Sequence, residues 1–340
     1  MEEETTPARR LTVLVTDPII TRWSEVLVSA APDHEWAFLT DADEPTQCSA
    51  VAECDVLICS RLSPDVARAC RAELVQVTGA GLDRVAVSAL PADTEVTTTA
   101  HHERSIAEHV LLSVMALERR LLGRDRSLRA GSWRTLATEP TMPAFRTLDT
   151  MVLGAVGLGG IGAETLRLAT AWGMQTIAIR GNPAGPLPQG LSPHWVGGPG
   201  DLTRLLREAD VVVVSVPLSA ATQGLLGAAE LTAMKPDAYL VNVARGPVVD
   251  QHALYAALTA PAGSAAAIGG AALDVWWGAP VPGRTPPADE DFAALDNVVL
   301  SPHSSGHAES TFVGRAADLG ANVDRLASGS ERLGVVQRRD

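Results

Sequence analysis

A glycine-rich turn between an apolar run and a helix-like segment constrains this chain more than any other feature. Residues 151–156 are short and apolar, as in a buried strand, and lead into Gly157, Gly159 and Gly162, spaced G-x-G-x-x-G. Residues 163–172 then follow a helical pattern. In such a unit the first glycine permits a tight turn, the second lets the backbone approach a pyrophosphate, and the third lets helix and strand pack closely. The order of strand, turn and helix therefore favours a dinucleotide-binding unit over an ordinary glycine-rich turn.

The length and charge of the chain restrict its class. Its 340 residues suggest two domains, and a net charge of -13 argues against nucleic-acid or anionic-membrane partners. The N-terminus lacks the apolar region of a secretory signal, and no long apolar run predicts a membrane span. Cys48, Cys54, Cys59 and Cys70 form no C-x-x-C pair. We therefore expect a cytoplasmic protein with reduced thiols and no metal site.

Apolar runs alternate with helical segments along the whole chain. This alternation predicts an α/β protein with parallel sheets, in which ligands bind at the carboxyl ends of the strands. The stretch 106–122 is expected to be one helix that bridges the two domains, 181–200 a loop, and the final residues frayed. Two further helices are predicted at 202–207 and 311–326. The predicted strands, in addition to 151–156, are 11–16, 56–59, 74–78, 176–179, 211–216, 238–243, 270–273 and 298–300.

Several motifs carry a resemblance to a known family. They are Gly79-Ala80-Gly81-Leu82-Asp83, Ile106-Ala107-Glu108-His109, the glycine turn, Pro217-Leu218, Met234-Lys235-Pro236, VNVARGPVVD at 241–250, Leu273-Asp274-Val275 and SPHSSG at 301–306. With these motifs the chain resembles the D-isomer-specific 2-hydroxyacid dehydrogenases along nearly its whole length. The resemblance implies two Rossmann-like domains with parallel sheets, an active site in the cleft between them, and a homodimer. The substrate domain would comprise residues 1–100 and 305–340, and the dinucleotide-binding domain residues 101–304.

The same resemblance assigns roles to residues at the expected site. Arg245 matches the arginine that binds the substrate's carboxylate and keto oxygen, and a guanidinium fork suits a planar anion. His303 matches the general acid/base. The backbone N–H groups of Ala80 and Gly81 match donors to the substrate carboxylate. Other candidates for contact with a small anionic substrate are His101, His102 and Trp277.

A further set of residues is assigned to the cofactor. Asp274 matches the aspartate that faces the nicotinamide, and this role is favoured over that of a cap or turn residue. The full set of cofactor candidates is Ile106, Gly157, Gly159, Gly160, Ile161, Gly162, Arg180, Val216, Pro217, Thr222, Val243, Ala244 and Asp274.

Two positions depart from the family pattern. If Pro280 keeps register with the family's proline, Ala279 stands where a glutamate normally pairs with the catalytic histidine. Arg180 replaces the acidic residue expected after the second strand of the nucleotide-binding unit. A carboxylate there would bind a ribose 2′-OH, whereas an arginine suits a 2′-phosphate. We therefore expect NADP to be preferred, with NAD as the alternative.

The resemblance implies an oxidoreductase that transfers hydride between a nicotinamide and C2 of a small 2-oxo or 2-hydroxy acid. Arg245 would bind the carboxylate and His303 would act as acid/base. Ala279 keeps two alternatives open. One is a dehydrogenase of a small anionic hydride donor, such as formate or phosphite, which needs no hydroxyl proton transfer. The other is a binding protein that senses the dinucleotide without catalysis.

Overall fold

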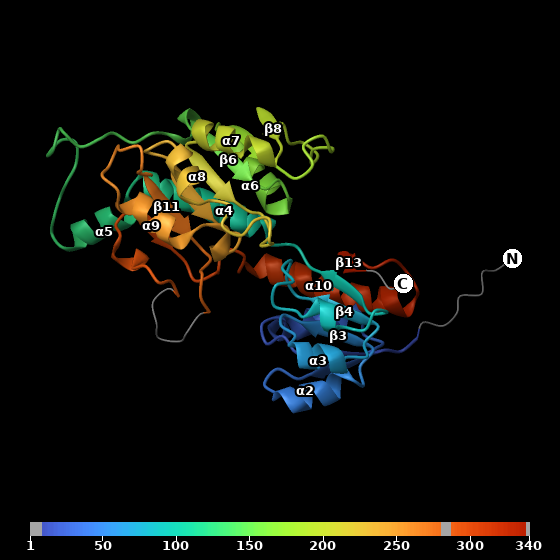
Figure 1. Cartoon of the computed structure of the whole chain (residues 1–340). Coiled ribbons are helices and arrows are strands. Elements are labelled where there is room, and N and C mark those ends of the chain that lie inside the picture. The colour runs from blue at the N-terminus through green and yellow to red at the C-terminus, as the bar shows by residue number, and fades with distance from the viewer. Residues whose placement is uncertain (1–8, 280–286, 338–340) are drawn as a thin grey trace. The chain divides into compact units, whose positions relative to one another are not determined.

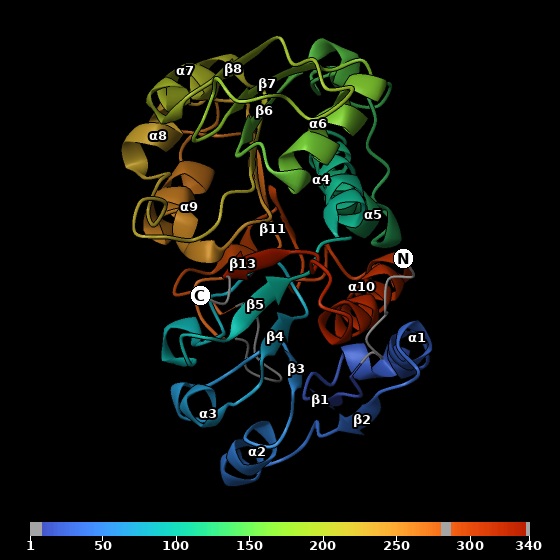
Figure 2. The same cartoon turned by 90° about the vertical axis from the view of Figure 1, so that its right-hand side faces the viewer.

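The chain forms two compact units in the computed structural model, which describes residues 9–279 and 287–337. Unit 1 comprises Met1–His101 and His307–Asp340, and unit 2 comprises His102–Gly306. The sequence predicted domain boundaries at 100/101 and 304/305, and the two units divide at 101/102 and 306/307. Both units are three-layered α/β structures (Figures 1 and 2).

The sheet of unit 1 has six strands among the described residues, in the order β13-β5-β4-β3-β1-β2. The order of the first five strands, 2-1-3-4-5, is that of a doubly wound sheet, and all five are parallel. The prediction of a frayed tail was wrong for β13, which pairs antiparallel with β5. Residues 338–340 lie outside the described part. The strands are β1 (Thr12–Val15), β2 (Glu35–Phe38), β3 (Val56–Cys59), β4 (Leu74–Val77), β5 (Glu95–Thr98) and β13 (Val335–Gln337).

Helices cover both faces of this sheet, as Figure 2 shows. On one face Leu57 and Val75 pack with residues of α2 and α3, and on the other Val13 and Ile58 pack with α1 and α10. The four cysteines are free, and burial raises the pKa of the Cys54 thiol to about 12. The helices are η1 (Ile20–Trp23), α1 (Ser24–Ala30), α2 (Glu44–Val51), α3 (Pro64–Ala69), η2 (Val87–Ala89) and α10 (Glu309–Ala327).

The sheet of unit 2 has seven parallel strands among the described residues, in the order β12-β11-β10-β9-β6-β7-β8. From β8 to β11 this is the 3-2-1-4-5-6 order of a Rossmann fold, so the order in which strands are added to the sheet reverses between β6 and β9. The predicted loop 181–200 contains the short edge strand β8. The strands are β6 (Val152–Val156), β7 (Gln175–Ile179), β8 (Trp195–Gly197), β9 (Val211–Val214), β10 (Tyr239–Asn242), β11 (Gly270–Leu273) and β12 (Val298–Leu300).

The predicted bridging helix 106–122 is two helices, and both belong to unit 2. The first ends because Arg120 takes a left-handed backbone conformation, with φ at 47°. It packs with α6 over one face of the sheet, and α7, α8 and α9 cover the other. The helices are α4 (Glu103–Glu118), α5 (Leu121–Arg129), η3 (Leu148–Thr150), α6 (Gly160–Ala171), η4 (Pro199–Asp201), α7 (Leu202–Glu208), α8 (Ala228–Ala233), η5 (Gly246–Val248), α9 (Gln251–Thr259) and η6 (Phe292–Ala294).

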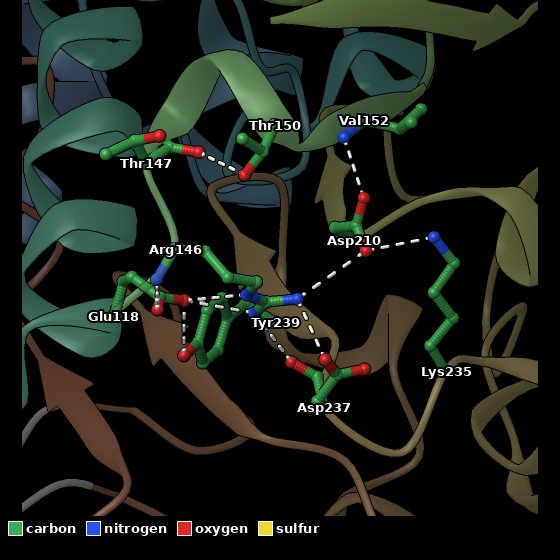
Figure 3. Close-up of polar contacts among 9 residues, drawn as sticks. All are labelled: Glu118, Arg146, Thr147, Thr150, Val152, Asp210, Lys235, Asp237 and Tyr239. Carbon is green, nitrogen blue, oxygen red and sulfur yellow. Dashed lines mark hydrogen bonds and ion pairs between the residues drawn. The ribbon is translucent and has the colours of Figure 1, made fainter. Parts of the chain in front are cut away.

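A cluster of charged side chains ties α4 to the amino ends of strands in unit 2 (Figure 3). Glu118 is buried and accepts hydrogen bonds from Arg146 at 2.7, 3.0 and 3.1 Å, and from the Tyr239 hydroxyl at 3.0 Å. Burial and the Glu118 charge raise the pKa of Tyr239 to about 12, so it remains a donor at neutral pH. Asp210 accepts a hydrogen bond from the N–H of Val152 at 2.8 Å and pairs with the Lys235 ammonium at 2.9 Å. The cluster lies at the opposite end of the strands from the glycine turn.

Glu118→Ala is expected to lower the free energy of unfolding by about 2–3 kcal/mol, because it removes a buried carboxylate that accepts hydrogen bonds from the half-buried side chains of Arg146 and Tyr239. Asp237→Ala is the matched control, since Asp237 pairs with the same guanidinium but its side chain is 68% exposed. Its cost should stay below about 1 kcal/mol. Equilibrium urea unfolding checks both values, and equal costs for the two variants would contradict this account.

Candidate active site

The glycine turn has the geometry of a dinucleotide site. Gly157 has φ at 105°, which favours glycine, and a Cβ on Gly162 would lie 2.1 Å from the Gly157 carbonyl oxygen. A Cβ on Gly159 would instead meet nothing within 4 Å, so the chain is open where a pyrophosphate would approach. Gly159 caps α6, a helix of 12 residues whose first N–H groups suit an anion. The residues present therefore fit a dinucleotide.

The other cofactor candidates surround this turn or lie at the same edge of the sheet. Val216 lies against Gly157, and the Thr222 hydroxyl donates to the Pro217 carbonyl at 2.6 Å, which closes the loop after β9. A Cβ on Gly160 would meet the Glu103 side chain at 2.8 Å. Of the remaining candidates, Ile106, Val243 and Ala244 are buried, and Ile161 is half-buried on α6.

Arg245 follows β10 at the carboxyl edge of the unit 2 sheet. Its Nη1 donates to the Ala244 carbonyl at 2.7 Å, and the side chain is half-buried. Asn242, which is fully buried, shapes the turn by donating to the Arg245 carbonyl at 3.0 Å and accepting from Ala244 N–H at 3.1 Å. A Cβ on Gly246 would lie 2.3 Å from the Trp276 carbonyl, so the turn packs tightly on the segment after β11. Sequence reasoning missed Asn242, whose signal was an amide within an apolar strand.

His303 lies in the segment 301–305, which follows β12 at the same edge. Its side chain is exposed, and its φ of 56° places a non-glycine residue in the left-handed region. Such a conformation costs about 1–3 kcal/mol and persists where the surroundings over-determine it. The Trp276 indole donates to the Ser301 carbonyl at 3.0 Å, and the Ser105 hydroxyl of α4 donates to the Ser305 carbonyl at 2.6 Å. Both contacts fix the backbone on either side of His303.

Asp274 is the main anchor of the segment 301–305. Its side chain is 1% exposed, and both carboxylate oxygens face the segment. One oxygen accepts from the Ser301 hydroxyl at 2.6 Å and from Ser304 N–H at 2.9 Å. The other accepts from Ser305 N–H at 3.1 Å and from the Ser305 hydroxyl. The assignment of Asp274 to the nicotinamide stays a prediction, and its observed contacts are with the His303 segment.

In unit 1, Ala80 and Gly81 lie beyond the carboxyl end of β4. No backbone hydrogen bond among the described residues uses the N–H of either one. Asp17, buried beyond β1, accepts from the Thr78 hydroxyl next to this turn and from Ile19 N–H at 2.7 Å. Two open amide donors therefore follow β4, as expected for an anion site. The sequence analysis did not name Asp17 as a site residue, although an acidic residue directly after a predicted strand is a signal for one.

The three other substrate candidates make contacts within their own units. His101 lies in unit 1, where its Nε2 is 2.7 Å from Asp318 of α10. His102 is buried in unit 2 and lies against Gly306. The Trp277 indole donates to the Val249 carbonyl at 2.8 Å, and its ring stacks on Phe292 at 5.3 Å. Their roles in substrate binding stay predictions.

Arg180 follows β7, where the acidic residue of the nucleotide-binding unit was expected. Its Nη1 donates to the Pro186 carbonyl at 3.0 Å and its Nη2 to the Gly185 carbonyl, while its buried Nε has no hydrogen-bond partner among the described residues. The guanidinium is therefore fixed beside the loop after β7. Ala279 is exposed, and Pro280, on which its alignment depends, lies outside the described residues.

No helix within residues 9–279 and 287–337 combines the length and apolar character that a membrane span needs. No group of three or more His, Cys, Asp or Glu side chains in the same ranges could hold a metal ion.

Comparison with known proteins identifies the family. The family model described as "D-isomer specific 2-hydroxyacid dehydrogenase, NAD binding domain" matches residues 111–305, more than half of the chain. The chain belongs to the D-isomer specific 2-hydroxyacid dehydrogenase family. The match covers the glycine turn, Arg180, Arg245, Asp274 and His303.

Relatives of this dehydrogenase-family chain carry different names. A glyoxylate reductase of Korarchaeum cryptofilum is 36% identical over 205 residues, which cover 60% of this chain and 57% of that protein. A D-3-phosphoglycerate dehydrogenase of Synechocystis sp. is 30% identical over 254 residues, which cover 74% of this chain and 42% of that protein. The chain thus spans about half the length of the curated relatives it matches.

A solved structure of the same family extends the likeness to the whole fold. The D-isomer specific 2-hydroxyacid dehydrogenase of Xanthobacter autotrophicus Py2, in complex with NADPH and MES, is 26% identical. It matches with a TM-score of 0.76 and covers 96% of this chain and 98% of that one. The two-domain α/β fold is therefore the fold of the family, as the sequence predicted.

Proposed function

We propose that this chain is an NADP-linked reductase of a small 2-oxo acid. One observation carries the proposal: a single edge of the unit 2 sheet presents the glycine turn, Arg245 and His303. The family supports a nicotinamide cofactor, which supplies the hydride when bound. The names of the relatives support a small 2-oxo acid, such as glyoxylate, as the substrate class.

The residues of this chain bind the acid and move a proton. The Arg245 guanidinium binds the carboxylate and polarises the C2 carbonyl, and His303 donates a proton to the carbonyl oxygen during reduction. In the oxidative direction His303 accepts that proton. Ala80 and Gly81 are proposed as further carboxylate donors through their N–H groups. The expected cleft between the two domains stays a prediction.

A substrate panel tests this function. NADPH oxidation is measured with glyoxylate, pyruvate, hydroxypyruvate and larger 2-oxo acids, and NADP⁺ reduction with formate and phosphite. The expected result is turnover with at least one 2-oxo acid. Turnover with formate or phosphite alone would contradict the proposal in favour of a hydride-donor dehydrogenase. Dinucleotide binding without any turnover would contradict it in favour of a sensor.

A preference for NADPH over NADH of about tenfold in kcat/KM is expected from Arg180. A charge-assisted hydrogen bond to a 2′-phosphate contributes about 1.5–3 kcal/mol. Part of this gain is offset, because Arg180 must give up its hydrogen bonds to the Gly185 and Pro186 carbonyls to bind the phosphate. Arg180→Ala should abolish the preference. Arg167→Ala, which removes an exposed arginine from α6, should keep the NADPH/NADH ratio of the unmodified protein. Equal or better kcat/KM with NADH in the unmodified protein would exclude the assigned role.

We also propose that the chain forms a homodimer through the segment 112–133. Leu112, Leu121, Leu128 and Trp133 are exposed there, and the Trp133 side chain is 70% exposed. The segment includes α5, labelled in Figure 1. Large exposed apolar side chains gathered in one segment favour an interaction surface, and a symmetric dimer is the commonest assembly.

Light scattering is expected to give a mass of about twice the 35.6 kDa of the chain. Replacing Leu128 and Trp133 together by Ser should shift the mass toward that of a monomer, because the variant loses apolar contact area. Leu187→Ser removes an exposed leucine from the loop after β7 and should leave the mass unchanged. A monomeric unmodified chain at micromolar concentration would contradict the dimer.

A further inference from the structure

The backbone around His303 is held more firmly than an exposed loop requires. Ser301, Ser304 and Ser305 flank His303 on both sides, and all three bond to one buried carboxylate, Asp274. Ser305 adds a second anchor, because its carbonyl accepts from the Ser105 hydroxyl of α4. The left-handed residue therefore lies between fixed points on either side.

We propose that Asp274, Ser305 and Ser105 are positioning residues that orient His303 through its backbone. The inference rests on the proposed function, in which His303 moves the proton. A left-handed non-glycine residue persists only when its neighbours over-determine the conformation. The contacts to Asp274 provide that constraint, and their burial strengthens them.

The arrangement extends one step further into α4. The Ser301 hydroxyl lies 2.6 Å from Asp274 and 3.3 Å from His109 Nε2. Because the carboxylate can only accept, the hydroxyl donates to Asp274 and accepts from His109, which carries its proton on Nε2. α4 therefore supports the His303 segment at both ends, through His109 near Ser301 and Ser105 at Ser305.

A double-mutant cycle distinguishes positioning from general stability. Ser305→Ala is expected to lower kcat for the best 2-oxo acid about tenfold or more, because small displacements of a catalytic group are costly. In the His303→Ala background the same change should alter kcat less than about twofold, since Ser305 acts only through His303. The NADPH dissociation constant should stay within about twofold in every variant.

Two further variants complete the design. Ser305→Thr keeps the hydroxyl and should restore kcat to within about threefold of the unmodified enzyme. Ser113→Ala removes a buried α4 hydroxyl that has no hydrogen-bond partner within residues 9–279 and 287–337, and should leave kcat unchanged. An equal loss from Ser305→Ala in both backgrounds, or no loss in either, would overturn the proposal.

Amide hydrogen exchange tests the anchoring without any substrate. Ser305→Ala should raise exchange in the peptide that contains Ser304 and residue 305 by about tenfold or more, since local opening exposes these amides, and Ser113→Ala should not. If the unmodified chain turns over no 2-oxo acid, the proposed function fails while exchange still tests the anchoring. Unchanged exchange in Ser305→Ala would overturn the inference in either case.

Discussion

His303→Ala is expected to lower kcat/KM for 2-oxo acid reduction by about 10²–10⁴-fold, the usual loss when a general acid is removed. The position of His303 at the end of β12, on the same sheet edge as the glycine turn, supports this role. His252→Ala is a matched control, because His252 is an exposed histidine on α9 that pairs with Glu290. It should leave kcat/KM unchanged.

The pH dependence has a defined sign. Reduction needs the protonated imidazole of His303, and oxidation needs the neutral form. Reductive kcat/KM should therefore decline as pH rises through the range of about 5 to 8 in which histidine side chains change charge, while oxidative kcat/KM increases. His303→Ala should flatten both profiles. Profiles of the unmodified enzyme that are flat across this range and insensitive to His303→Ala would exclude His303 as the acid and favour a formate-like reaction.

Arg245→Lys is expected to lower kcat/KM for a 2-oxo acid by about 10²-fold or more, equivalent to about 3 kcal/mol of transition-state stabilisation. Lysine keeps the positive charge but lacks the planar fork that binds a carboxylate with two parallel hydrogen bonds. Affinity for NADPH should barely change, because the lost contacts are to the acid. Steady-state kinetics and NADPH titration by fluorescence measure the two effects separately.

Arg167→Lys makes the same exchange at an exposed position on α6 and controls for the substitution itself. Its kcat/KM should stay within about twofold of the unmodified enzyme, as expected for a surface change. If Arg245→Lys also kept activity within about threefold, Arg245 would not be the carboxylate anchor.

The sequence predicted those strands whose apolar residues are continuous. The predicted ranges 56–59, 270–273 and 298–300 agree with β3, β11 and β12, all from apolar runs. Strand β2 (Glu35–Phe38) was missed because it lies at the sheet edge and is largely exposed, so it has no buried period. Strand β5 (Glu95–Thr98) was missed because buried polar residues break its apolar pattern, and Glu95 is paired with Arg332, 237 residues away.

The same distinction applies to the candidate site. The roles of Gly157 and Gly162 were predictable because a backbone angle and a close approach are local constraints. The anchoring of the His303 segment was not, because Asp274 bonds to residues 27 to 31 positions away. His101 is a similar case, since its partner Asp318 lies 217 residues further along the chain. Local patterns therefore predicted the glycine turn, whereas the side-chain partners depended on the tertiary structure.

Transfer of deuterium from the nicotinamide tests the central claim most directly. The enzyme would be supplied with NADPH carrying deuterium at C4, in separate experiments on each face, and with the best 2-oxo acid of the panel. Mass spectrometry of the 2-hydroxy acid is expected to show one deuterium at C2 from one of the two labelled cofactors. A product without deuterium at C2 from either cofactor, or no 2-hydroxy acid at all, would contradict hydride transfer between the nicotinamide and C2.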